Sequence, residues 1–291
     1  MAFDRWVSPW DRSWPFAVFK KHHTQLNELW WSHRCASGRA FSIAKSVGVG
    51  NSVVNAFPRA VIDKGRQALP LKEWNSFYSD FDNWVRLSSA VSLCSYFEIY
   101  LGKVVTLAIR SDPSVLLRCS KAIDGVILLK KNHVPDTKEK RISVTKGMWS
   151  ARLASYEAMF SIAPPEFKSQ ISELDQLQRL RNGFGHTFGR DIDDYDEPII
   201  FSPKPLQRLS EERLMKWMGI VEKAAQSIDK QLRVNHIGAF EVLEGYHLWD
   251  KKFPAGTIHE HVAFRSTFPS LQNKLKPAAY FKDAIHFYKK A

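Results

Sequence analysis

Apolar residues recur at steps of three and four positions through the middle of the chain, and the longest such run lies between Lys72 and Pro113. This spacing places apolar side chains on one face of an α-helix. Because no proline interrupts the run before Pro113, the pattern predicts one helix of about 35 residues, or two shorter helices end to end. The apolar positions are Phe77, Phe81, Trp84, Val85, Leu87, Val91, Cys94, Phe97, Leu101, Val104, Val105 and Ala108.

Capping signals mark the starts of the helices that follow. Asp112 stands before Pro113 as an N-cap. Pro165 opens a later helix with Glu166 in its first turn, and Ser210 caps a third. The predicted helices span residues 16–35, 56–69, 72–111, 114–129, 145–161, 165–182, 210–233 and 278–288, with 240–249 as helix or strand and 130–141 and 191–205 as loops.

Strand signals are few and scattered, so the sequence predicts a mostly helical, all-α fold. We expect a helical core over residues 71–235. A tryptophan-rich helical extension, residues 1–70, precedes it, and a C-terminal extension, residues 236–291, follows it.

Composition and charge narrow the class of protein. With 44% hydrophobic and 25% charged residues among 291, the chain can bury a core, which excludes wholesale disorder and collagen-like structure. The net charge of +12 favours a polyanionic partner such as nucleic acid, although a merely basic protein is the alternative.

The three cysteines, Cys35, Cys94 and Cys119, are odd in number and form no CxxC pair. This argues against a disulfide framework and a zinc site, and it predicts a cytoplasmic protein. Cys94 lies in an apolar stretch and is expected to be buried.

One segment resembles a membrane span. Residues 90–109 are mostly apolar, but Glu98 and Lys103 lie near the middle, where charge would be costly in a bilayer. A buried core helix is therefore expected, with no membrane partner. The N-terminal ten residues lack an apolar core, so no signal peptide is expected.

The motif Arg181-Asn182-Gly183-Phe184-Gly185-His186 has the form R-N-x-x-x-H and ends an amphipathic helix with leucines at 174, 177 and 180. It resembles the signature of the HEPN superfamily, whose active members are mostly metal-independent ribonucleases with an R-x(4–6)-H motif. Arg179 also lies within the permitted distance of His186. Glycines at 183 and 185 are unfavourable in a helix, so a loop or a frayed helix end is the alternative setting.

The resemblance covers about residues 72–233 and implies an antiparallel helical bundle. It implies cleavage of single-stranded RNA by attack of the 2′-hydroxyl on the adjacent phosphate. His186 would transfer protons, Arg181 would stabilise phosphate charge, and Asn182 would orient either group. No cofactor or metal is expected, because no ring of carboxylates is present.

Other residues are assigned supporting roles. A weaker resemblance, over residues 95–101, places Glu98 on a helix that presents an acidic residue, and we expect it to pair with Arg181 or Arg179. Lys130, Lys131 and Arg190 are predicted to contact substrate phosphates, although solvated surface positions are the alternative.

The resemblance also implies a homodimer with facing motifs and a role as a toxin or antiviral-defence effector, restrained by an antitoxin or another regulatory partner. Two alternatives to the ribonuclease interpretation remain open. One is a catalytically silent HEPN module that binds nucleic acid or a protein partner such as a nucleotidyltransferase. The other is an unrelated helical scaffold with a chance motif.

Overall fold

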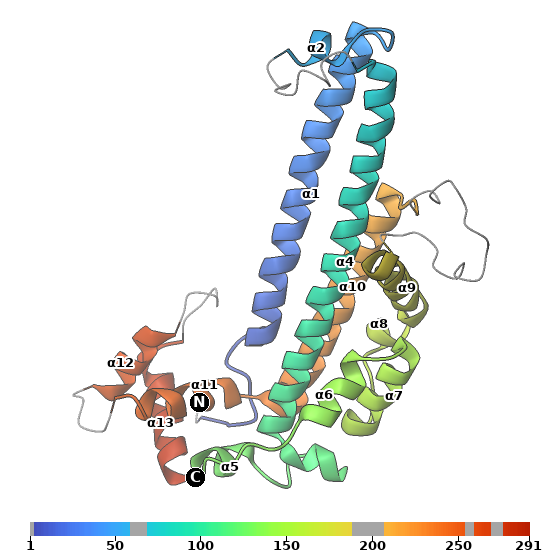
Figure 1. The fold of residues 1–291 in the computed structure, drawn as a ribbon. Coiled ribbons are helices and arrows are strands. Elements are labelled where there is room, and N and C mark those ends of the chain that lie inside the picture. The colour runs from blue at the N-terminus through green and yellow to red at the C-terminus, as the bar shows by residue number, and fades with distance from the viewer. Residues whose placement is uncertain (1–2, 59–68, 188–206, 254–258, 269–275) are drawn as a thin grey trace. The chain divides into compact units, whose positions relative to one another are not determined.

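The computed structural model describes residues 3–58, 69–187, 207–253, 259–268 and 276–291 (Figure 1). Over these residues the chain is all-α, as predicted: they contain no strand, only an isolated β-bridge between Ser52 and Pro70. The α-helices are α1 (Trp14–Val47), α2 (Val53–Ala56), α4 (Leu71–Ser111), α5 (Gly125–Lys130), α6 (Lys138–Thr145), α7 (Trp149–Phe160), α8 (Pro165–Lys168), α9 (Ile171–Thr187), α10 (Glu211–Leu232), α11 (Phe240–Asp250), α12 (Glu260–Thr267) and α13 (Ala278–Lys290).

The long periodic run forms a single helix, α4, of 41 residues. By length and composition it could cross a membrane, but 61% of its apolar window is buried, which is also typical of a core helix. Cys94, for example, is 1% exposed. Ser210 caps α10 as predicted, since its hydroxyl accepts a hydrogen bond from the backbone N–H of Arg213 at 3.2 Å.

Several predicted boundaries are wrong, including that of the predicted helix 165–182, which is divided into α8 and α9. Helix α1 does not stop near Cys35 but continues to Val47, and it ends only where Gly48 adopts a φ of +93°. Residues 114–129 are not one helix. They form a short 3-10 helix, Pro113–Leu117, and then α5, because the Asp112 carboxylate accepts hydrogen bonds from Ser120 and Lys121 and turns the chain back.

The predicted loop 130–141 contains the start of α6, where Asp136 accepts a hydrogen bond from the backbone N–H of Lys138. The predicted helix 145–161 is interrupted at Gly147, whose φ is +82°. The ambiguous segment 240–249 lies in helix α11. Most of the predicted helix 56–69, and the whole of the predicted loop 191–205, lie outside the described residues.

The chain divides into two compact units. Unit 1 comprises residues 1–21, 96–175 and 220–291, and unit 2 comprises residues 22–95 and 176–219. The boundaries fall within α1, α4, α9 and α10, so each of these helices contributes to both units. The three-part division into residues 1–70, 71–235 and 236–291 remains a prediction.

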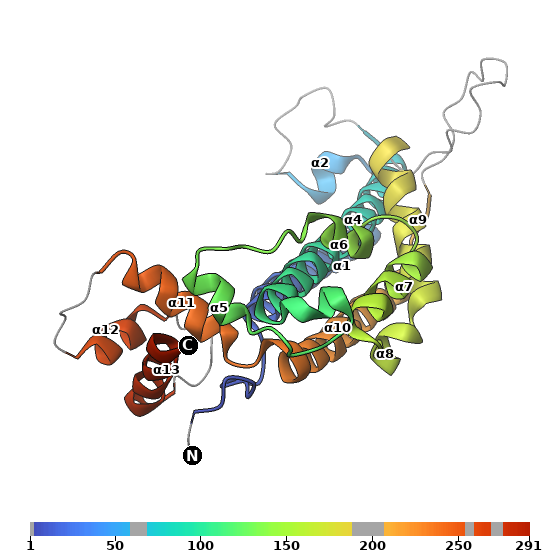
Figure 2. The same ribbon diagram turned by 90° about the horizontal axis from the view of Figure 1, so that it is seen from below.

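Unit 1 has an aromatic core and a buried N-terminal segment. Phe97 stacks on Trp149 with ring centroids 5.1 Å apart, and helix α13 packs against α11 and α12 (Figures 1 and 2). Arg5 is 3% exposed and donates to the carbonyl oxygens of Ser111 and Ile237, both at 2.9 Å. The N-terminal segment is therefore an integral part of unit 1.

In unit 2, residues 22–47 of α1 lie alongside residues 71–95 of α4 (Figure 1). The pairing is antiparallel: Phe41 contacts Tyr78 edge to face, and His33 bonds the Asp82 carboxylate at 2.8 Å. Burial alone would raise the pKa of Asp82. The His33 hydrogen bond and the charge of Arg86 outweigh that effect, so the pKa is lowered. An ionised Asp82 therefore joins the two helices.

Candidate functional site

The R-N-x-x-x-H motif lies on a helix. Helix α9 begins at Ile171 and continues without interruption through both motif glycines to Thr187. A Cβ atom at Gly183 would meet nothing within 4 Å, so open space surrounds this glycine. The alternative setting on a loop does not apply to the backbone of residues 181–187.

The helical register determines which motif positions share a face. At about 100° per residue, position 182 lies about 40° from position 186 and position 179 only about 20° from it. Position 181 lies about 140° away. Arg179 rather than Arg181 therefore shares the face of position 186. No side chain is described for Gly185, His186 or Thr187.

The described motif side chains differ in exposure. Arg179 and Asn182 are exposed, whereas Arg181 is half-buried and donates from Nη1 to the Asn182 Oδ1 atom at 3.0 Å. Within the described part of the chain, the Arg179 side chain forms no ion pair or hydrogen bond. Arg179 is thus a solvent-accessible cation on the face of α9 that carries position 186.

A cavity of about 400 Å³ opens beside this face of α9, and all of its lining belongs to unit 2. Three arginines line it from two directions, Arg179 from α9 and Arg208 and Arg213 from the start of α10 and the segment before it. The remaining lining residues are Gln176, Leu180, Gln207, Leu209 and Trp217. We call this cavity the arginine pocket.

Neighbouring groups position the arginines of this pocket. The Arg213 guanidinium lies over the Trp217 ring, 5.0 Å from its centroid, and donates to the side-chain oxygen of Gln176. Buried Asn83 accepts from the backbone N–H of Leu209 at 2.9 Å and donates to the carbonyl oxygen of Gln207 at 2.8 Å. These two bonds hold the backbone on both sides of Arg208. The segment before α10 is therefore fixed to α4.

Glu98 pairs with an arginine, and that arginine is Arg152 of α7. The Arg152 Nη2 atom donates to Glu98 Oε1 at 2.9 Å, and the side chains are 2% and 15% exposed. The sequence predicts Arg181 or Arg179 as the partner of Glu98. No sequence signal indicates Arg152, whose guanidinium also lies over the Trp149 ring, 4.3 Å from its centroid.

The predicted phosphate contacts from lysine lie in unit 1. Lys130 ends α5, donates to the carbonyl oxygen of Lys289 at 3.3 Å and lies over the Tyr288 ring. Lys131 is the exposed residue after α5. Arg190 lies outside the described residues. The motif belongs to unit 2, so the role of these lysines remains a prediction.

The carboxylates with the largest pKa shifts are structural. Burial raises the pKa of Asp229 to about 6 and that of Glu241 to about 8. Both carboxylates accept hydrogen bonds from backbone N–H groups at the N-terminus of α1. Asp229 accepts from Ser13, and Glu241 accepts from Trp14. They anchor the start of that helix within unit 1.

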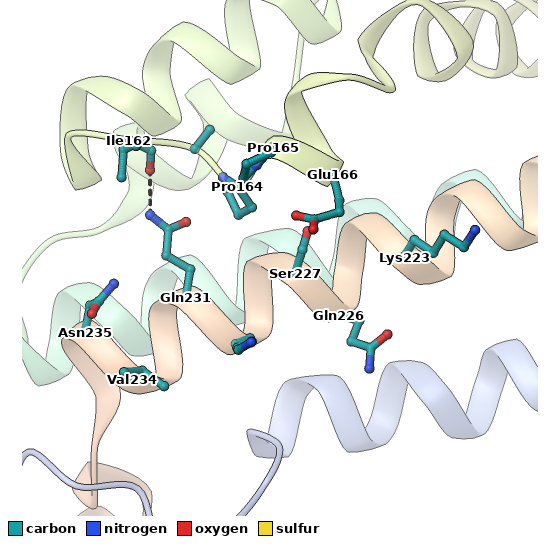
Figure 3. Close-up of a pocket in the computed structure, with 12 residues that line it drawn as sticks. Ile162, Pro164, Pro165, Glu166, Lys223, Gln226, Ser227, Gln231, Val234 and Asn235 are labelled. Atoms are coloured by element: carbon teal, nitrogen blue, oxygen red, sulfur yellow. Dashed lines mark hydrogen bonds between the residues drawn. The ribbon is translucent and has the colours of Figure 1, made fainter.

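A second cavity, of about 570 Å³, lies in unit 1 between the segment around Pro164 and the C-terminal half of α10 (Figure 3). The Gln231 side chain connects the two sides of the cavity, because it donates to the carbonyl oxygen of Ile162 at 2.6 Å. The Ser227 hydroxyl donates to the carbonyl oxygen of Ala224, and the described lining contains neither histidine nor cysteine. This cavity therefore lacks a serine–histidine or cysteine–histidine pair.

Metal ligands do not gather among the described residues, where no group of three or more His, Cys, Asp or Glu side chains is positioned to hold an ion. The chain was compared with protein-family models, curated proteins and solved structures, and none of them matches it.

Proposed function

We propose that the chain is a metal-independent endoribonuclease of the HEPN type that cleaves single-stranded RNA. The observation that carries the proposal is the unbroken helix α9, which brings positions 179, 182 and 186 onto one helix face, where Arg179 and Asn182 are exposed. This face combines a cation, an amide and a histidine. A net charge of +12 favours a polyanionic substrate.

The reaction needs only proton transfer and charge stabilisation. The ribose 2′-oxygen attacks the adjacent phosphorus, and its proton passes to a base. The bond to the 5′-oxygen breaks, and that oxygen takes up a proton. His186 is the proposed proton-transfer group, because its ordinary pKa lies near neutrality. The products are a 2′,3′-cyclic phosphate and a 5′-hydroxyl.

An arginine stabilises the charge on the phosphate in this proposal. Guanidinium groups donate in a planar fork that matches phosphate oxygens. Arg181 is the motif arginine, but the register of α9 favours Arg179 for a phosphate held beside His186. Asn182 orients the phosphate or Arg181, from whose Nη1 atom the Asn182 side chain already accepts a hydrogen bond.

The proposal includes a two-fold homodimer in the cytoplasm, with RNA as substrate and an antitoxin or regulatory protein as restraint. An exposed aromatic row on α4 within unit 2 offers apolar surface for such a contact. Phe77, Phe81 and Trp84 are 61%, 47% and 45% exposed. Sedimentation at micromolar concentration tests this part: a strict monomer that cleaves RNA would contradict a composite site.

The decisive experiment is cleavage of labelled single-stranded RNA by the full chain in excess EDTA. We expect cleavage with 2′,3′-cyclic phosphate ends, no cleavage of DNA, and at least about 100-fold loss in His186→Ala. His22→Ala, which changes a surface histidine, is the matched control and should cleave normally. Activity that disappears with EDTA and returns with a divalent ion would contradict the mechanism. RNA binding without cleavage would favour the catalytically silent module.

A further inference from the structure

We propose that the arginine pocket binds an RNA phosphate one or more nucleotides away from the bond that is cleaved. This inference rests on the proposed function for the identity of the strand. The pocket itself rests on three arginines from two separate parts of unit 2 that converge on one cavity of about 400 Å³.

The chemistry of the lining favours a phosphate. Arg179, Arg208 and Arg213 bring three positive charges to one small cavity, and no carboxylate is among the lining residues that the structure describes. Asp80 pairs with Arg208, but both side chains are at least half-exposed, at 50% and 60%. Exposed ion pairs of this kind contribute little, so a phosphate can replace Asp80 at small cost.

The pocket is already arranged before a ligand arrives. Trp217 and Gln176 hold Arg213, and the two backbone hydrogen bonds of Asn83 hold the segment that carries Arg208. Arg213, fixed in this way, loses little conformational freedom when it binds, so more of its interaction energy contributes to affinity. Planar guanidinium groups are suited to phosphate oxygens.

The length of α9 places the pocket beyond the cleaved bond. Residues 176, 179 and 180 form its α9 wall, and position 186 lies seven residues past Arg179. At 1.5 Å per residue this separation is about 10 Å along the helix axis. That is longer than the step between neighbouring phosphates. The phosphate held by Arg208 and Arg213 is therefore not the one beside His186, and Arg179, which shares the face of position 186, is left to the latter.

A strand that occupies both places must be longer than a dinucleotide. Affinity should therefore rise with oligonucleotide length until the pocket is filled. A free phosphate or mononucleotide would reach only the pocket and would lack this length dependence. The proposal commits to a strand of RNA.

The test uses the full chain and 2′-O-methyl RNA of two, four and eight nucleotides, labelled with fluorescein and followed by anisotropy. Methylation removes the nucleophile, so binding is measured without cleavage. We expect Arg208→Gln and Arg213→Gln each to weaken octanucleotide binding about tenfold, as for a lost charge-assisted hydrogen bond. The slope of log K against log salt should fall by about 0.7 for one phosphate contact.

Arg34→Gln is the matched control. Arg34 is also a surface arginine of unit 2 and is paired with a carboxylate, Glu211, but it does not line the pocket. Its octanucleotide affinity should stay within about twofold of the native value. Arg208 is exposed, so Arg208→Gln keeps the test valid even if Arg213→Gln disturbs packing on Trp217.

Two results would overturn the pocket assignment. One is octanucleotide binding by Arg208→Gln and Arg213→Gln that matches Arg34→Gln. The other is displacement of the octanucleotide by inorganic phosphate with equal affinity. Failure of the proposed function is a separate result: length-dependent binding that needs these arginines, without any cleavage of unmodified RNA, would retain the pocket and remove the ribonuclease.

Discussion

Replacing Glu98 with glutamine should destabilise the protein without impairing its chemistry. The substitution removes the charged partner of Arg152, a guanidinium that is only 2% exposed. Arg152 would keep the carbonyl oxygen of Gly147, 2.9 Å from its Nε, and its contact with the Trp149 ring. Neither neighbour carries a compensating negative charge.

The size of the effect follows from this burial. Removing one partner of a buried ion pair costs about 3–5 kcal/mol, and the lower value applies because a glutamine oxygen can still accept a neutral hydrogen bond. With an unfolding entropy of about 2 cal/mol/K per residue over 291 residues, a loss of about 3 kcal/mol lowers the midpoint by about 5 °C.

Thermal unfolding at pH 7, followed by near-ultraviolet circular dichroism, measures this loss. Glu157→Gln is the matched control, since Glu157 pairs with Lys168 on the surface, and it should change stability by no more than about 0.5 kcal/mol. Equal midpoints for Glu98→Gln and Glu157→Gln would refute the reasoning. RNA cleavage that falls tenfold in Glu98→Gln at unchanged stability would instead assign Glu98 a positioning role at the site.

Three further predictions concern the motif helix and the start of α1. Arg179→Ala should lower RNA cleavage at least as much as Arg181→Ala, because position 179 shares the face of position 186; the opposite order in kcat/KM would refute the assignment from helical register. Gly183→Ala should raise the unfolding free energy in urea by up to about 1 kcal/mol, since open space surrounds this helical glycine; destabilisation would contradict that environment. Burial raises the pKa of Glu241 to about 8, so this carboxyl binds its proton more tightly in the folded state than in the unfolded state. The protonated carboxyl therefore contributes fully to stability below about pH 4.5, and this contribution is lost as the pH rises through 8. Midpoints of native protein should therefore fall between pH 6 and 9, and Glu241→Gln should reduce that fall; equal slopes would exclude Glu241 as the cause.

Sequence periodicity and capping predicted the helices whose apolar face is long and regular. Helices α4 and α10 follow this rule, because each buries a regular series of apolar positions, and Ser210 also caps α10. Segment 114–129 does not follow it. There the buried Asp112 carboxylate bonds His236 at 3.0 Å, more than a hundred positions away, and such a contact leaves no local pattern.

The candidate site was predictable only along one helix. The motif on α9 is contiguous in sequence, so the register of residues 179–186 follows from the helix itself. The arginine pocket depends on which helix lies beside α9, and nothing in the spacing of Arg208 and Arg213 indicates that neighbour. The only sequence signal was that two arginines flank the Ser210 cap. By itself this pattern is equally typical of ordinary surface charge.

The buried N-terminal segment limits how this chain can be shortened. Removing residues up to Ser13 would leave the carbonyl groups of Ser111 and Ile237 without the Arg5 donors, and Asp229 without the Ser13 groups it accepts. Gly238 marks the same junction, because a Cβ atom there would lie 2.4 Å from the Arg5 carbonyl oxygen. A trimmed chain therefore loses contacts that hold unit 1 together. Because Arg5 is buried, tryptic cleavage after it would report early opening of unit 1.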